Sequence, residues 1–227
     1  MTSAEINKIK NKIVQVLKTH SHVSPSRGRK LIQFKDMVGK LYEAEVLAEI
    51  IKNLVTKEGL RVSLHGSGNL ILKAKGGPIN RSFPYFDVWK NGQLFAELFN
   101  DIYFNTLSSV SIGNSGNLKG DYHELDIVLL RPGVKDSDKP KPDQIYLAVE
   151  CKNTTLKKNL IRELLGFRRE LSYLSMPLQT EFIHWPVSFI AAQPPSVHMF
   201  YISRSKYLNE FKKNCEVFGI LLEHHPM

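Results

Sequence analysis

Cysteine is scarce in this chain of 227 residues, which contains only Cys151 and Cys215. Two thiols cannot build the dense disulfide framework that holds a small secreted domain together. They also exclude a zinc site made from cysteine pairs and an iron–sulfur cluster that needs four thiolates. The eight histidines form no HExxH motif or other close metal-ligand spacing. The thiolate-rich and histidine-rich classes of metal site are therefore excluded.

An apolar segment suited to export or membrane insertion is also missing. The N-terminal residues carry Glu5 and soon afterwards Lys8, Lys10 and Lys12, so no signal peptide is expected. The one long uncharged stretch, residues 182–203, contains three prolines and two histidines, which disfavour a membrane helix. We expect a soluble protein of the cytoplasm with no membrane partner.

Positive charge is in excess, with 31 Lys and Arg against 22 Asp and Glu and a formal net charge of +9. Such an excess favours an anionic partner, and for nucleic acid it does so through counterion release. The alternative is that the charge only improves solubility. Length and a hydrophobic content of 42% predict one globular domain, residues 31–227, preceded by a helix and a basic linker at residues 1–30.

Hydrophobic periodicity predicts a mixed α and β chain without internal repeats. Helices are expected over residues 3–20, 36–57, 157–175 and 206–214, with a polar linker over 21–30. Strands are expected over residues 61–64, 70–74, 86–90, 93–99, 124–130, 145–151, 187–192 and 198–203, with a short apolar run at 218–222. Asn91-Gly92 is typical of a tight hairpin turn. This order predicts a mixed central sheet flanked by helices, with inserted hairpins between residues 60 and 120.

Two predicted strands carry acidic residues inside otherwise apolar runs. Side chains alternate between the two faces of a strand, so Glu150 and Lys152 share the face opposite Cys151. In the preceding strand, Asp126 is out of phase with the apolar residues on either side of it. Buried carboxylates are costly unless they are paired or bind a metal, and their oxygens suit magnesium or manganese. The lysine could then orient a water and offset charge on a phosphate.

The order Asp126, then hydrophobic-Glu150-x-Lys152, resembles the PD-(D/E)xK superfamily of nucleases, with Mrr-type restriction enzymes and archaeal Holliday-junction resolvases nearest in motif style. The resemblance implies a restriction-endonuclease-like α/β fold in which Asp126 and Glu150 hold magnesium. It implies that Lys152 positions the attacking water and that the backbone carbonyl of Cys151 is a further ligand. Leu125 stands where the superfamily's name has proline.

Many of these nucleases add a glutamate from the preceding helix in a Gly-x-x-x-Glu pattern, which Gly39 and Glu43 match. At 100° per residue, Glu43 falls near the middle of the apolar face that includes Val46, Leu47 and Ile50. A carboxylate on that face is explained by metal or water ligation. The alternative is a solvated acid near the first helical turn.

The resemblance implies a magnesium-dependent endonuclease that acts on DNA and accepts manganese as a substitute. It also implies a family-level setting in restriction or host defence. A homodimer is expected because one active site cuts one strand and many relatives pair to cut two. Basic residues on the helix after the motif are predicted to contact phosphates: Lys157, Lys158, Arg162 and Arg168. The alternative for them is a solvated helix face. Alternatives for the whole chain are an inactive nuclease-like binder of nucleic acid or protein, or a nuclease acting on RNA.

Two competing explanations for the acids remain open. Glu150 and Lys152 could form a surface ion pair of little energetic value. Asp87 and Glu97 are rival strand acids, but they flank the Asn91-Gly92 turn, so a polar outer face of that hairpin explains them better.

Overall fold

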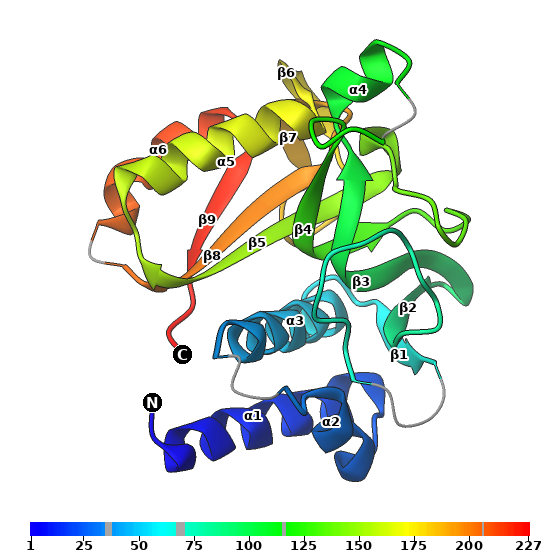
Figure 1. The fold of residues 1–227 in the computed structure, drawn as a ribbon, viewed down its shortest axis with the longest axis vertical. Helices are drawn as coiled ribbons and strands as arrows, with labels where there is room; N and C mark the ends of the chain where they lie inside the picture. The colour runs from blue at the N-terminus through cyan, green and yellow to red at the C-terminus, as the bar shows by residue number, and fades with distance from the viewer. Residues whose placement is uncertain (35–37, 67–70, 115–116, 206) are drawn as a thin grey trace.

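The computed structural model describes residues 1–34, 38–66, 71–114, 117–205 and 207–227. Its centre is a seven-stranded sheet in the order β1-β2-β3-β4-β5-β8-β9 (Figure 1). The strands are β1 (Arg61–His65), β2 (Tyr85–Lys90), β3 (Gln93–Asn105), β4 (Tyr122–Leu130), β5 (Ile145–Thr155), β8 (Val197–Arg204) and β9 (Ile220–His224). Neighbours from β1 to β5 are antiparallel, whereas β5, β8 and β9 are parallel. The predicted mixed central sheet is confirmed.

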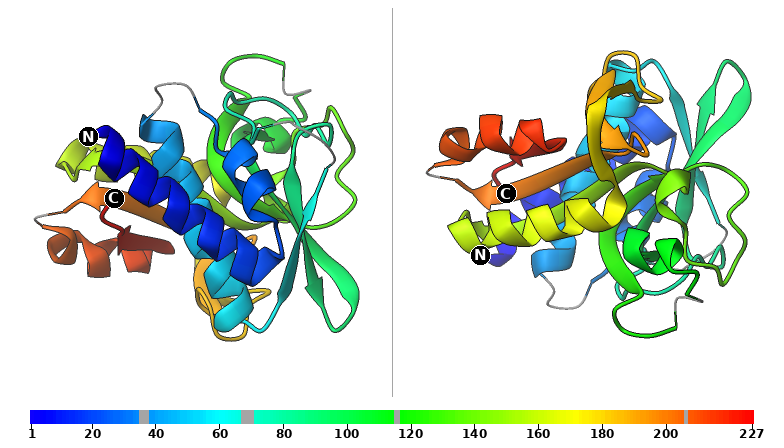
Figure 2. Two further views of the ribbon diagram at one scale, coloured as in Figure 1. Left: turned by 90° about the horizontal axis from the view of Figure 1, so that it is seen from below. Right: turned by 90° about the horizontal axis from the view of Figure 1, so that it is seen from above.

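Helices cover both faces of the sheet (Figures 1 and 2). One side carries α1 (Ser3–Ser21), α2 (Pro25–Leu31) and α3 (Val38–Thr56), and the other carries α5 (Lys158–Leu171) and α6 (Leu208–Val217). A short α4 (Leu107–Ser111) and a separate two-stranded ribbon, β6 (Tyr173–Gln179) with β7 (Phe189–Gln193), complete the described elements. No helix in the described part of the chain combines the length and apolarity needed to cross a membrane.

The N-terminal helix belongs to the same core as the sheet. A capping box formed by Thr2 and Glu5 starts α1, and its apolar face packs on α3. Ile13 and Leu17 are buried in one cluster with Ile50 and the inner face of β4 and β5. A stripe of apolar residues at helical spacing therefore holds α3 between α1 and the sheet, which fixes the position of Glu43.

Three sequence-based predictions of local structure are wrong. The linker over 21–30 contains α2, because Ser24 caps it and Pro25 fits its first turn. The strand expected at 70–74 is not formed over 71–74, and residue 70 lies outside the described residues. The predicted helix over 157–175 ends at Leu171, and β6 begins two residues later. Predicted helix ends at 36 and 206 also lie outside the described residues.

Candidate metal centre

The strand pair β3–β4 brings two aspartates face to face. The register pairs Asn100 with Ile127 and Ile102 with Leu125, so Asp101 stands opposite Asp126. Asp101 is fully buried, and its φ of 53° is left-handed, an unfavourable conformation for a residue with a side chain in the middle of a strand. Like charges directly opposite each other destabilise a strand pair. Both features indicate a local arrangement that is not optimised for stability.

A third carboxylate comes from α3. Ligand oxygens of Glu43, Asp101 and Asp126 all lie within 4.8 Å of one another. The structure therefore brings together two residues predicted from the sequence, Glu43 and Asp126, and adds Asp101, which the sequence analysis missed. An all-oxygen set of this kind suits a hard divalent cation such as magnesium or manganese.

Burial makes all three acids reluctant to ionise. Burial, followed by the charge of Asp126, raises the pKa of Glu43 to about 8. Burial also raises the pKa of Asp101 to about 6, although Lys40 acts in the opposite direction. The pKa of Asp126 is likewise raised by burial. A divalent cation would favour the ionised forms by replacing the lost solvation and offsetting the repulsion.

Strand β5 is joined to this cluster through its main chain. The backbone N–H of Cys151 donates a hydrogen bond of 2.7 Å to Asp126 Oδ2. The predicted alternation is observed, since Val149 and Cys151 lie in the core with α3, whereas Ala148 packs in a different cluster. One hydrogen bond therefore couples the motif strand to the ligand on its neighbour.

Glu150 is almost completely buried, at 4% exposure, so it is not part of a surface ion pair. Its Oε2 lies 3.6 Å from Lys152 Nζ, whereas its Oε1 has no hydrogen-bond partner among the described residues. Burial, followed by the charge of Asp126, raises the pKa of Glu150 well above its ordinary value. A buried oxygen without a partner fits a ligand atom, although Glu150 is not within the 4.8 Å group formed by Glu43, Asp101 and Asp126.

Lys152 remains available as a cation. Burial lowers its pKa, but the charges of Glu150 and Asp126 outweigh burial, and the net shift is upward. Its Nζ also lies 3.9 Å from Glu163 Oε1 on α5. The amine is therefore an ammonium at neutral pH and can donate hydrogen bonds, but it cannot act as a base.

The four basic residues predicted to contact phosphates fall into two groups. Lys157, Lys158 and Arg162 are exposed near the start of α5. Arg168 is 4% exposed, and its guanidinium donates hydrogen bonds to the carbonyls of Phe218 and Ser196. Arg168 is therefore held inside the protein and does not face a polyanion.

The rival strand acids have side-chain partners of their own. Glu97 forms a bidentate pair with Arg81, with N–O distances of 2.9 and 2.7 Å, and Asp87 lies 3.1 Å from the Nδ1 of His65. Glu97 is buried at 5% exposure, so placing it on a polar outer face was wrong. Neither acid belongs to the metal-ligating group of described residues.

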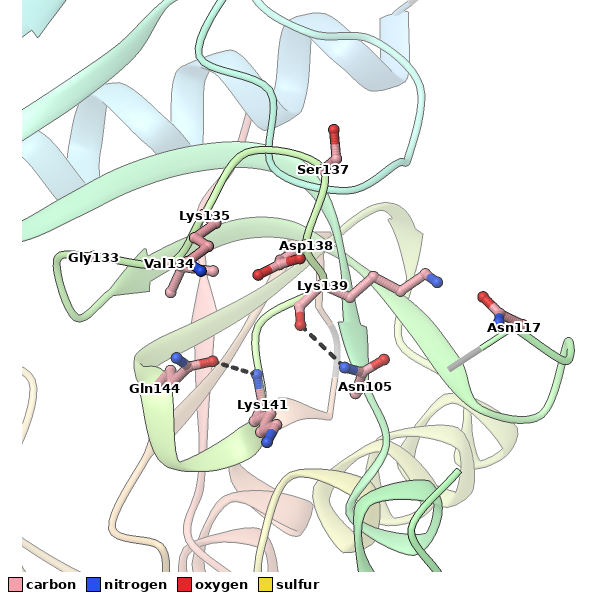
Figure 3. A pocket seen from close by; sticks show the side chains of 10 residues that line it. All are labelled: Asn105, Asn117, Gly133, Val134, Lys135, Ser137, Asp138, Lys139, Lys141 and Gln144. Carbon is pink, nitrogen blue, oxygen red and sulfur yellow. Dashed lines mark hydrogen bonds between the residues drawn. The ribbon is translucent and has the colours of Figure 1, made fainter. Parts of the chain in front are cut away.

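A separate polar cavity of about 500 Å³ lies between the end of β3 and the loop after β4 (Figure 3). Lys135, Lys139 and Lys141 contribute to its lining, and Asn105 joins it to β3 by donating a hydrogen bond to the carbonyl of Lys139. None of the carboxylates of the metal centre lines this cavity. Along β3, it begins four residues beyond Asp101.

This chain is similar to solved structures but matches no family model. No family model matches the chain, and no curated protein matches it. Among solved structures, NucC from P. aeruginosa ATCC27853 in its cAAA-bound form is similar over 97% of this chain and 74% of its own, at 10% identity and a TM-score of 0.34. NucC from E. coli MS115-1, also in its cAAA-bound form, is similar over 97% of this chain and 73% of its own, at 12% identity and a TM-score of 0.34.

Proposed function

We propose that this chain is a divalent-metal-dependent nuclease that hydrolyses phosphodiester bonds in DNA. The observation that carries the proposal is the convergence of Glu43, Asp101 and Asp126 within 4.8 Å, beside the Glu150-x-Lys152 strand. Carboxylates from one helix and two strands meet there, and burial raises the pKa of each of them. A structural role does not explain such an arrangement, whereas cation binding does.

In this proposal the acidic residues bind the metal ion and Lys152 orients the water. Glu43, Asp101 and Asp126 would hold magnesium, or manganese in its place. Glu150 and the carbonyl of Cys151 are further ligands by their resemblance to the PD-(D/E)xK pattern. When bound, the ion supplies Lewis acidity to the phosphate and lowers the pKa of a bound water. The ammonium of Lys152 orients that water and offsets the charge that develops on the phosphate.

The charge of the chain favours nucleic acid as the substrate, and the resemblance to the PD-(D/E)xK pattern favours DNA. The chain carries a net charge of +9, and three exposed cations, Lys157, Lys158 and Arg162, follow the motif strand directly. They would bind phosphates without reading sequence. One centre cuts one strand, so a homodimer would allow cleavage of both, and restriction or host defence is the setting implied by the resemblance.

The test is cleavage of supercoiled plasmid in magnesium, manganese or chelator by the wild type and by Lys152→Ala. We expect cleavage only with metal, and a rate about 10²-fold to 10³-fold lower in the variant, because it lacks one transition-state donor. Circular dichroism should show that the variant is folded. Wild-type rates in Lys152→Ala would reject the assigned role.

The same preparation separates the alternatives. An inactive nuclease-like binder would retain DNA binding but show no Asp126-dependent uptake of metal in calorimetry. Side-by-side assays on duplex DNA, single-stranded DNA and RNA would identify a nuclease of RNA.

A further inference from the structure

Lys40 lies at the entrance to the carboxylate cluster. It precedes Glu43 by three residues on α3, and its Nζ lies 2.7 Å from Glu43 Oε2 and 2.5 Å from Asp101 Oδ1. The Lys40 side chain is 15% exposed, whereas Asp101 is fully enclosed. One ammonium therefore bridges two of the three carboxylates that form the candidate metal centre.

Lys40 occupies one carboxylate oxygen on each of two residues of the candidate metal centre, Glu43 Oε2 and Asp101 Oδ1. Asp101 Oδ2 already accepts a hydrogen bond of 3.1 Å from Asn100 Nδ2, so Lys40 holds the other oxygen of that carboxylate. On the neighbouring strand, Asp126 Oδ2 is engaged by the N–H of Cys151. A divalent ion that shared Asp101 Oδ1 with the ammonium would bring like charges within a few ångströms in a site shielded from water, where repulsion is strong.

Resting on the proposed function, we propose that Lys40 is a tethered cation that occupies the metal centre in the metal-free protein and that an incoming divalent ion must displace. The lysine stabilises the carboxylates when no metal is bound and lowers the affinity for metal, because its bonds to Glu43 and Asp101 must first be broken. The Lys40 side chain is partly exposed and its four-carbon stem is flexible, so the ammonium can move away while α3 stays intact.

The experiment is calorimetric titration of the full chain with MnCl₂, comparing wild type with Lys40→Met and Lys40→Gln. Methionine keeps the length and the helix propensity of lysine, and glutamine keeps a polar group without charge. We expect both variants to bind Mn²⁺ about tenfold more tightly than wild type, as they would if Lys40 occupied the centre in about nine of ten metal-free molecules. Thermal melting provides a second readout, since Lys40→Met should melt lower than wild type in chelator and gain more from Mn²⁺.

Lys52→Met is the matched control. Lys52 is on the same helix and pairs with Glu49 three residues away, at 2.8 Å, but on an exposed surface. Its Mn²⁺ affinity should equal that of the wild type. Unchanged or weaker Mn²⁺ binding in both Lys40 variants would overturn the competitor role while leaving the metal centre intact. Absence of Mn²⁺ binding in wild type and variants alike would reject the metal centre itself, and this inference with it.

Discussion

Two regions of this protein bury ionisable groups, and they do so in opposite ways. In the first, the carboxylate cluster formed by Glu43, Asp101 and Asp126, like charges converge on one point. In the second, the buried basic pair formed by Arg168 and His198, the guanidinium donates hydrogen bonds to the backbone carbonyls of Phe218 and Ser196, while its Nη2 has no hydrogen-bond partner among the described residues. Both are shielded from solvent, so burial of charge alone does not distinguish them.

The two regions differ in which groups they bring together. Hydrogen bonds from Arg168 tie α5 to the turn between α6 and β9 and to the start of β8, which are fixed structural elements. The carboxylate cluster instead gathers acidic groups from α3, β3 and β4, with Lys40 as a shared partner of Glu43 and Asp101, and one oxygen of Glu150 has no partner among the described residues. The convergence of like-charged groups on one point, rather than a shifted pKa, therefore indicates a functional site. Variants in either region can test this contrast.

The largest effect is expected from Asp101→Asn. Asparagine accepts the left-handed backbone conformation but removes the ligand charge, so metal-dependent plasmid cleavage should fall about 10³-fold.

Because burial raises the pKa of Asp101 to about 6, ionising this residue at pH 8 costs stability. The variant should therefore be more stable, by about 1 kcal/mol, in urea unfolding with chelator at pH 8. The control is Asp136→Asn, at an exposed partner of Arg81, which should change neither quantity. Loss of both stability and cleavage would mean that Asp101 is structural.

The second effect concerns stability alone. Arg168→Met should lower the free energy of unfolding by about 3 kcal/mol, because two buried carbonyls lose a charged donor. Cleavage per folded molecule should stay at the wild-type value. Arg169→Met is the matched control: the neighbouring side chain is exposed and lies 4.8 Å from the ring centroid of Tyr173, so its loss should cost less than 1 kcal/mol. Urea unfolding and plasmid cleavage measure the two readouts, and a large loss of cleavage in Arg168→Met would bring this region into the active site.

The third effect is a pH dependence at His198. Burial, followed by the charge of Arg168, lowers the pKa of His198 to about 3, and neither ring nitrogen has a partner among the described residues. The unfolded chain, with an ordinary pKa near 6.5, binds a proton first, so stability is full above that pH and falls below it. Between pH 7.5 and 5.5, this residue should cost the wild type about 1 kcal/mol in the free energy of unfolding.

His198→Leu should remove that increment from the difference between the two pH values. The exposed His65→Leu serves as control and should keep it. An identical pH dependence in wild type and His198→Leu would show that the imidazole is not the acid-sensitive group.

Much of the candidate site could be predicted because it depends on local periodicity. Apolar alternation located β4 and β5 and placed Asp126 and Glu150 within them, and the helical phase put Glu43 on the inner face of α3. These inferences need only the geometry of one element at a time. The mixed sheet flanked by helices followed from the order of such elements.

Asp101 could not be found in that way. Asn100-Asp101 is a pair typical of turns, and the strand continues through it only because β4 supplies partners on both sides. The apolar residues Ile102 and Phe104 were the available signal that β3 continues. The position of Asp101 opposite Asp126 is set by long-range register, which no local pattern contains.

The prediction that Arg168 contacts phosphates is wrong for a similar reason. Basic residues on a helix usually face solvent, but here the turn at Gly219 closes over the guanidinium. A Cβ on Gly219 would lie 3.1 Å from Arg168 Nη2 and 2.9 Å from a side-chain carbon of Ile190, and the residue has a φ of 69°. Packing between elements far apart in the sequence decides the burial of Arg168.

The left-handed backbone at residue 101 also constrains how this protein can evolve. Asparagine and glycine are the replacements best tolerated there, and each is reached from an aspartate codon by a single nucleotide change. Either would relieve strain or repulsion while removing a ligand of the proposed centre. Descendants that keep the fold and lose the proposed hydrolysis are thus one mutational step away, and selection for that proposed activity would have to act continuously to keep the acid in place.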